Sequence, residues 1–210
     1  MLAATGLTAL LVAFALDCVF GEPPARWHPV VWMGRWLAWS GRRAAPPADA
    51  PAAPARDFLA GALAWNLGAC LVLLAAIALQ AALLFLPWWA AGVLAGIALK
   101  PLLAWRMLRE ETAGVEAALA DSLQAGRARL ARLVSRDVAQ LDETAVRESA
   151  IESLAENLND SVVAPVFWFV LLGLPGAALY RFANTADAMW GYRGERGGRI
   201  WTWAGRFAAR

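Results

Sequence analysis

Apolar and polar positions separate into long blocks along the chain instead of alternating at short range. The first charged residue is Asp17, and the apolar run before it continues to Phe20. A stretch of this length is long enough to cross a hydrocarbon core of about 30 Å. The pattern therefore predicts a transmembrane helix over residues 2–20.

A second uncharged run extends from Asp57 to Lys100 and is about twice as long as one crossing requires. Pro87 interrupts this run, and the two tryptophans that follow it are typical of a membrane–water interface. We therefore expect a transmembrane hairpin over residues 58–86 and 88–106.

Basic residues flank this hairpin at both ends, and a basic flank favours the cytoplasmic side. Residues 21–57 and the segment after the hairpin are therefore expected in the cytoplasm, with the amino terminus outside. Within 21–57, tryptophans at helical spacing predict a helix lying in the membrane interface, and the stretch 41–55, rich in proline and alanine, predicts a flexible linker. The tryptophans are Trp32, Trp36 and Trp39, and the flanking basic residues are Arg26, Arg35, Arg42, Arg43, Arg56, Lys100, Arg106 and Arg109.

Residues 107–160 form a polar segment in which apolar positions recur at helical spacing, which predicts cytoplasmic amphipathic helices. A helix stop is expected at Gly126, and Asp142 is placed to cap a helix that extends to about Asn159. Carboxylates stack along one face of that helix at Glu148, Glu152, Glu156 and Asp160. This stripe is either a solvated surface or a site for Mg²⁺, which is typically held by one or two carboxylates together with phosphate oxygens.

The last apolar run, residues 161–180, is long enough to cross the membrane but contains prolines and glycines that break helices. A complete crossing would place the basic tail, residues 181–210, outside, against the expectation for basic segments. The run is therefore either a broken span or a re-entrant segment, which is tolerated where it is buried in protein or lines a cavity. One Asn-x-x-Asp sequence precedes the run at 157–160 and a second follows it at 184–187. A re-entrant path would bring both sequences to the cytoplasmic face.

The composition narrows the class of protein. Hydrophobic residues make up 60% of the chain and charged residues 17%, compared with about 45–50% and about 25% in soluble domains. The net charge of +2 is too small to indicate a nucleic-acid partner, and the two cysteines form no metal-binding motif. We predict a single-domain, all-α, polytopic integral membrane protein with a cytoplasmic helical segment and a broken or re-entrant apolar segment.

Two further polar residues lie at the expected membrane boundary. His28 is the only histidine. It is either a structural side chain hydrogen-bonded to a neighbouring loop, or a group that contacts substrate and acts as a general base. Asp17 ends the first apolar run, where a charge is costly, so it is either functional or caps the helix in interfacial water.

Several longer segments carry a more specific pattern. They are GEPPARWHPVVWMGR (21–35), AIESLAENLND (150–160), APVFW (164–168), GLPGAALY (173–180) and NTADAMWGYRGER (184–196). Together with Arg136-Asp137 and Leu141-Asp142, these segments resemble the CobD/CbiB family of adenosylcobinamide-phosphate synthases over essentially the whole chain. The chain has Asp160-Ser161 where the family has Asp-Gly. The family also continues past the position of Arg210, so the chain is expected to be a fragment or a shortened member.

The resemblance implies an acid–amine ligase of the bacterial inner membrane, with its active face in the cytoplasm. Such an enzyme joins adenosylcobyric acid to aminopropanol or its phosphate and consumes Mg-ATP. The partners implied are the corrinoid and aminoalcohol substrates, the lipid bilayer and other membrane enzymes of cobalamin biosynthesis, and no nucleic acid. The alternative is a non-catalytic membrane regulator or transport-associated protein of the same fold.

These considerations lead to a hypothesis for the site. ATP would not bind through a P-loop, because the sequence has no GxxxxGK[ST] motif. Carboxylates would hold Mg²⁺, amides would orient substrate oxygens, and guanidinium groups would neutralise phosphate. The residues predicted to be catalytic are Glu152, Glu156, Asp160, Asp187 and His28; those predicted to bind substrate or phosphate are Arg136, Asn157, Asn184 and Arg193; and those predicted to bind Mg²⁺ are Glu156, Asp160 and Asp187.

Overall fold

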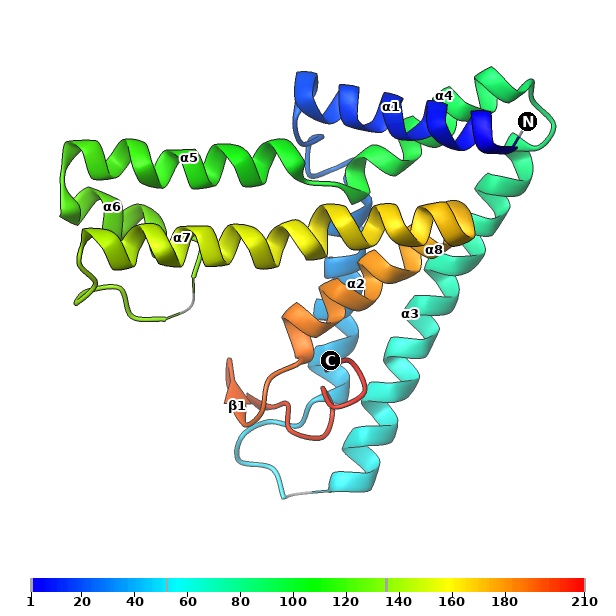
Figure 1. Ribbon diagram of the computed structural model, residues 1–210. Helices are drawn as coiled ribbons and strands as arrows, with labels where there is room; N and C mark the ends of the chain where they lie inside the picture. Colours follow the sequence, from blue (N-terminus) through cyan, green and yellow to red (C-terminus); the bar gives the residue numbers. More distant parts are fainter. Residues whose placement is uncertain (1, 52, 135, 210) are drawn as a thin grey trace.

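The computed structural model describes residues 2–51, 53–134 and 136–209. Most of the chain in these ranges is helical, and the strands there are two short ones that pair antiparallel. The elements in order (Figure 1) are α1 (Leu2–Phe20), α2 (Pro29–Ala44), α3 (Pro54–Leu83), α4 (Trp88–Leu99), the 3-10 turn η1 (Lys100–Leu102), α5 (Trp105–Asp121), α6 (Leu123–Leu130), α7 (Glu143–Leu158), the π-helical turn η2 (Asn159–Val163), α8 (Ala164–Trp190), β1 (Glu195–Arg196) and β2 (Arg199–Ile200).

Four helical stretches in the described ranges are long and apolar enough to cross a membrane. They are Ala3–Phe20, Pro54–Leu83, Trp88–Asp121 and Glu143–Trp190. Along α3, leucines four residues apart, including Leu59, Leu63 and Leu67, are exposed on one face, as expected for a helix in contact with lipid. The chain is therefore an all-α membrane protein, as the sequence predicts.

Small residues bring α1 and α4 together, and the two helices run side by side in the same direction (Figure 1). A Cβ added at Gly96 of α4 would lie 2.6 Å from the carbonyl oxygen of Ala9, and one added at Gly92 would lie 2.8 Å from Thr8 Cβ. Glycines four residues apart allow this close approach, and packing of this kind drives helix association in bilayers. Because the two helices are parallel, the ends that carry Asp17 and Lys100 meet.

The chain reverses direction inside α8, at Gly173 (Figure 1). Gly173 has a φ of 70°, which is in the left-handed region, and an added Cβ there would lie 2.1 Å from Gln80 Oε1 of α3. The N–H of Leu174 donates to the same oxygen at 2.8 Å. Because the hydrocarbon core offers no water, a backbone N–H freed by such a break needs an acceptor within the protein. Gln80 supplies it, and the chain doubles back within residues 161–180, which fits the re-entrant alternative. We name residues 159–190 the re-entrant hairpin.

The helices α5, α6 and α7 project from the membrane helices as an arm (Figure 1, left). The arm has its own apolar core, which contains Val115, Leu119 and Val146. Asp142 caps α7, and its Oδ1 accepts a hydrogen bond from the Ala145 N–H at 2.8 Å. We name these three helices and their connections, residues 105–158, the arm.

The structure corrects four expected boundaries. The second half of the hairpin does not form one helix over 88–106, because α4 ends at Leu99 and Pro101 lies in the turn before α5. The first half begins at Pro54 and ends at Leu83, three residues before the expected end. Gly126 does not end a helix, since the break lies at Ser122, which caps α6, and Gly126 packs inside α6 against Leu119. Residues 41–44 of the expected linker belong to α2.

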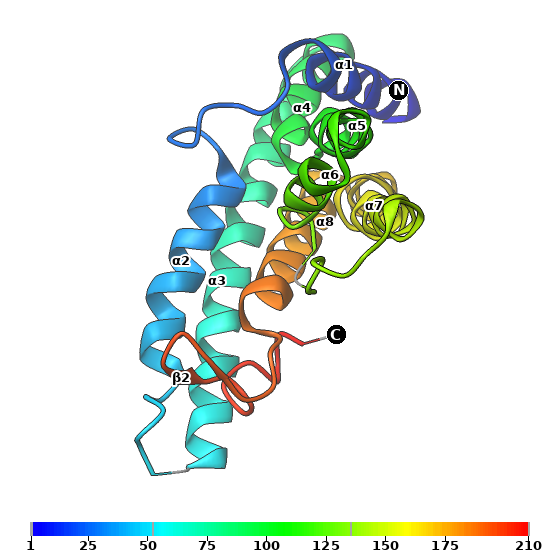
Figure 2. The same cartoon turned by 90° about the vertical axis from the view of Figure 1, so that its left-hand side faces the viewer.

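The carboxyl-terminal segment folds back onto the first loop and α2, as Figure 2 shows. Trp190 and Trp201 stack with ring centroids 6.0 Å apart, and Trp190 Nε1 donates to the Leu37 carbonyl at 3.2 Å. Pro47 of the first loop forms a β-bridge with Arg199. The α2 helix contacts both α3 and α8 and runs lengthwise beside α3 (Figure 2). It therefore follows the direction of an apolar helix long enough to cross the membrane, contrary to the expected helix in the plane of the interface.

Candidate functional site

Charged residues from separate segments meet where α1 and α4 end. Lys100 Nζ lies 3.3 Å from Asp17 Oδ1 and 3.3 Å from Glu22 Oε2. The Asp17 side chain is fully buried, and its Oδ2 accepts a hydrogen bond from the Arg106 N–H at 2.7 Å. Charges at such depth persist only when they are paired. We name the group Asp17, Glu22, His28 and Lys100 the boundary cluster.

Glu22 is the acidic member of this cluster that reaches solvent, with 27% of its side chain exposed. Burial raises the pKa of Glu22, but the contacts with His28 and Lys100 outweigh burial and lower it below its usual value of 4.5. The carboxylate therefore stays ionised at neutral pH.

His28 has both ring nitrogens engaged. Nδ1 accepts a hydrogen bond from the Val30 N–H at 3.2 Å and caps α2, and Nε2 lies 2.9 Å from Glu22 Oε2. In the neutral tautomer that fits these contacts, Nε2 carries the proton and donates it. This geometry favours the structural alternative for His28, in which it holds Glu22 and the start of α2.

The re-entrant hairpin also brings together a second group of polar side chains. Arg181 Nη1 donates to Ser161 Oγ at 2.9 Å, and the Tyr180 hydroxyl lies 3.4 Å from Asp160 Oδ1. Arg181 also interacts electrostatically with Glu22, which joins this group to the boundary cluster. Asp160 and Ser161 lie in the π-helical turn η2, an irregularity that is frequent at functional sites.

A small polar pocket of about 200 Å³ lies in the arm and contains predicted site residues. Arg136 forms an ion pair with Glu152 across it. Asn157 donates from Nδ2 to the Ser153 carbonyl at 2.8 Å. The pocket is lined by Leu133, Val134, Arg136, Glu152, Ser153, Glu156 and Asn157. A guanidinium beside carboxylates provides groups for both a phosphate and the cation that accompanies it.

The structure thus distributes the predicted site residues over different places. Arg136, Glu152, Glu156 and Asn157 line the arm pocket. Asp160 lies in η2 beside Tyr180, Asn184 and Asp187 lie on the returning half of α8, and Arg193 is exposed in the segment after it. Within 2–51, 53–134 and 136–209, no three His, Cys, Asp or Glu side chains gather closely enough to hold a metal ion. The assignment of Mg²⁺ to Glu156, Asp160 and Asp187 therefore stays a prediction that requires ligands from substrate.

The sequence prediction missed Glu22, Lys100, Tyr180 and Arg181 as members of the site. A signal for Lys100 was present: it is the only lysine and it ends an uncharged run, as Asp17 does. Both runs were expected to end on the cytoplasmic side, so an ion pair between the opposite charges at their ends could have been predicted. Arg181 carried no comparable signal, because its position depends on the reversal at Gly173.

Comparison with known proteins gives a consistent result. The family model described as CobD/Cbib protein matches residues 10–210. The chain is 41% identical to a probable cobalamin biosynthesis protein CobD of Thermococcus kodakarensis, over 97% of this chain and 64% of the relative. It is 45% identical to the cobalamin biosynthesis protein CobD of Chromobacterium violaceum, over 89% of this chain and 58% of the relative.

The chain thus spans about three fifths of the length of these curated relatives. No solved structure matches it. The family match covers nearly the whole chain, including the boundary cluster, the arm pocket and the re-entrant hairpin. The chain belongs to the CobD/CbiB protein family.

Proposed function

We propose that the protein takes part in cobalamin biosynthesis as an adenosylcobinamide-phosphate synthase, which forms an amide between adenosylcobyric acid and aminopropanol phosphate and consumes ATP. Family membership and the names of the relatives support the pathway. The observation that supports the site assignment is the reversal inside α8, which brings Arg181 to Asp160 and Ser161, while Arg181 also interacts electrostatically with Glu22 of the boundary cluster. The pocket in the arm begins about one helical turn before Asp160, at Glu156 and Asn157 of α7.

The reaction needs an activated acyl group, because a free carboxylate does not react with an amine near neutral pH. In the proposed first step, the substrate carboxylate attacks the γ-phosphorus of ATP, so an acyl phosphate forms and ADP leaves. The amine then attacks the acyl carbon, a proton is lost from nitrogen, and inorganic phosphate leaves. Phosphoryl transfer depends mainly on positioning and charge neutralisation by the protein.

The arm pocket has the side chains that such a transfer requires. Arg136 would neutralise phosphate oxygens, and Asn157 would orient the substrate. Glu156, with Asp160 one turn further on, would hold Mg²⁺ directly or through water, and the phosphates would complete its ligands. The bound ion would offset the negative charge of the phosphates. The pair of carboxylates in the pocket beside a guanidinium fits this role, whereas a closed all-protein metal site does not fit the described residues.

Beside Asp160, Arg181 would bind the phosphate of the aminoalcohol. Asp187, on the returning half of α8, is the third predicted ligand of Mg²⁺, and Asn184 on the same half would orient substrate oxygens. His28 would position Glu22 through the hydrogen bond between them.

The test uses membranes that contain this chain, supplied with adenosylcobyric acid, aminopropanol phosphate and Mg-ATP. The expected product is adenosylcobinamide phosphate, detected by mass spectrometry, with one phosphate released per amide. Glu156→Gln and Asp160→Asn are each expected to lower the rate roughly a hundredfold or more. Glu148→Gln is the matched control, because Glu148 is exposed on the same helix and outside the pocket lining.

Wild-type rates in both Glu156→Gln and Asp160→Asn would contradict the site assignment. Corrinoid crossing the bilayer without product would favour a transport-associated function instead, since broken helices at membrane depth are also typical of transporters.

A further inference from the structure

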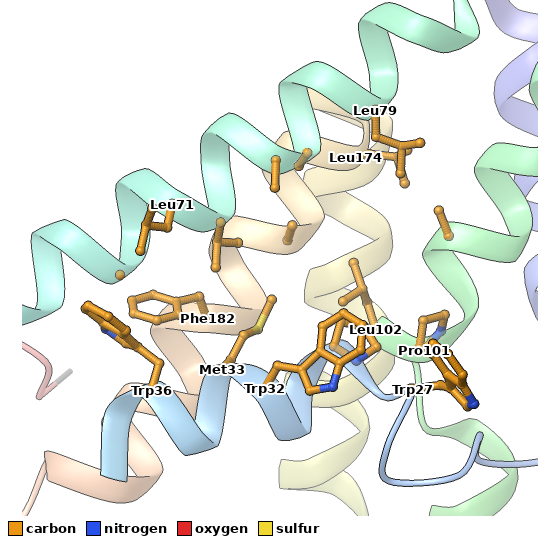
Figure 3. A pocket seen from close by; sticks show the side chains of 17 residues that line it. Trp27, Trp32, Met33, Trp36, Leu71, Leu79, Pro101, Leu102, Leu174 and Phe182 are labelled. Atoms are coloured by element: carbon orange, nitrogen blue, oxygen red, sulfur yellow. The ribbon is translucent and has the colours of Figure 1, made fainter. Parts of the chain in front are cut away.

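An apolar pocket of about 540 Å³ lies between α2, α3 and the returning half of α8 (Figure 3). Trp27, Trp32 and Trp36 line it from α2 and the link before α2, and Leu71 and Leu79 line it from α3. Trp27 is 66% exposed and Trp32 is 49% exposed. The same two tryptophans therefore form the wall of the pocket and part of the outer surface.

The outward face of α2 combines tryptophan with arginine. Trp32, Arg35, Trp39, Arg42 and Arg43 are all exposed, and their spacing places them on one side of the helix. The guanidinium of Arg43 lies 4.0 Å from the ring centroid of Trp39. The opposite face packs into the protein through buried residues such as Met33 and Leu37. We name the five exposed residues the Trp–Arg face.

This surface carries charge of one sign only. The sequence between Glu22 and Asp49 has no acidic residue, whereas it has Arg26 and the three arginines of the Trp–Arg face. Trp32 Nε1 donates to the Arg26 carbonyl at 3.0 Å, which ties the backbone of Arg26 to a tryptophan that lines the pocket. No described side chain forms an ion pair with Arg26 or Arg35, so their donors are available to a ligand.

We propose that this surface binds an anionic phospholipid, with the phosphate against Arg26 and Arg35 and one acyl chain in the pocket. The guanidinium group matches phosphate in geometry as well as charge. Tryptophan is enriched at headgroup depth in membrane proteins, where basic residues attract anionic lipids. The apolar lining suits a hydrocarbon chain and contains no partner for a charged headgroup. The acyl chain is therefore assigned to the pocket and the phosphate to the arginines.

The test measures quenching of tryptophan fluorescence by brominated lipids in vesicles of phosphatidylcholine. Brominated phosphatidylglycerol is expected to bind about fivefold or more tightly than brominated phosphatidylcholine at sites near tryptophan. The double variant Arg26→Gln/Arg35→Gln is expected to lose this preference. The matched control is Arg129→Gln/Arg132→Gln, which removes the same charge from the arm, where both residues pair with Glu111.

A separate variant tests the pocket. Ala75 lines the pocket from α3, so Ala75→Phe narrows the pocket without changing any charge. This variant is expected to weaken the binding of brominated phosphatidylglycerol at least threefold. Equal binding of both lipids by the wild type would overturn the proposal. So would an equal loss in the arm control, which would indicate general attraction by net charge, and unchanged binding in Ala75→Phe would overturn the placement of the acyl chain.

Discussion

At the scale of single residues, Lys100 compensates two carboxylates that come from different parts of the chain. Its ammonium lies between Asp17 and Glu22, and 7% of its side chain is exposed. A charge left alone at this depth is costly, and a matched pair is much less so. The contribution of the boundary cluster to the free energy of unfolding therefore depends on how many of its charges remain unpaired.

Replacing Lys100 tests this dependence. Lys100→Met leaves Asp17 buried without its cation and is expected to lower the free energy of unfolding by roughly 3–5 kcal/mol. The double variant Asp17→Asn/Lys100→Met removes both charges and is expected to recover a large part of the loss. Unfolding in mixed micelles, followed by circular dichroism, measures both values, and additive losses in the double variant would argue against coupling.

Glu22 gives the boundary cluster a dependence on pH. The pKa of its carboxyl is lowered in the folded state, because the contacts with His28 and Lys100 outweigh burial. A lowered pKa means that Glu22 stabilises the fold above the ordinary value of 4.5, and that this contribution disappears as the pH falls below it. The difference in midpoint of thermal unfolding between wild type and Glu22→Gln is therefore expected to shrink from pH 7 to pH 4. A constant difference would show that folding does not lower the pKa of Glu22.

At the scale of elements, the sequence predicts the helices better than the joints between them. The apolar runs and the Asp142 cap locate α1, α3, α4 and α7 from local information alone. The end of α4 before Pro101 and the break at Ser122 also have local causes, a proline and a cap that accepts from the Ala125 N–H, but the sequence prediction did not use them. The stripe at Glu152, Glu156 and Asp160 is visible in the sequence, whereas the approach of Arg181 to Asp160 requires the fold.

The reversal at Gly173 depends on two residues far apart in sequence. Gly173→Ala is expected to destabilise the protein strongly, because φ is positive and the new Cβ would meet Gln80. Gln80→Leu keeps the backbone but leaves the Leu174 N–H without its acceptor, at a cost of about 1–3 kcal/mol. Thermal unfolding in detergent measures both, and Gln80→Ala, which leaves room for water, is the comparison. Wild-type stability in Gly173→Ala would contradict a fixed reversal.

At the scale of the whole molecule, the re-entrant path resolves the conflict between the apolar run 161–180 and the basic tail. Because the chain returns, the tail packs against the first loop through the bridge between Pro47 and Arg199. Both basic segments are then expected on one side of the membrane. The turn between α3 and α4 lies at the other end of the membrane helices (Figure 1).

Labelling with a membrane-impermeant maleimide checks this arrangement in a background with Cys18→Ser and Cys70→Ser. Ala48→Cys in the first loop and Ala209→Cys in the tail are expected to react from the same side. Phe85→Cys, which replaces an exposed side chain between α3 and α4, is expected to react from the opposite side. Reaction of Ala209→Cys and Phe85→Cys from one side would indicate a complete crossing instead.

The π-helical turn between α7 and α8 holds one residue more than an α-helical turn would hold in its place. The wider turn absorbs this residue, so the helices on either side keep nearly the orientation of one continuous helix. Deleting one residue from the turn would restore uninterrupted α-helical winding and would change mainly the direction of the side chains inside the turn, including Asp160. The Tyr180 hydroxyl and the Arg181 guanidinium would then lose their partners in the turn, although every helix could still form. The direction of the Asp160 side chain is therefore set by one extra residue.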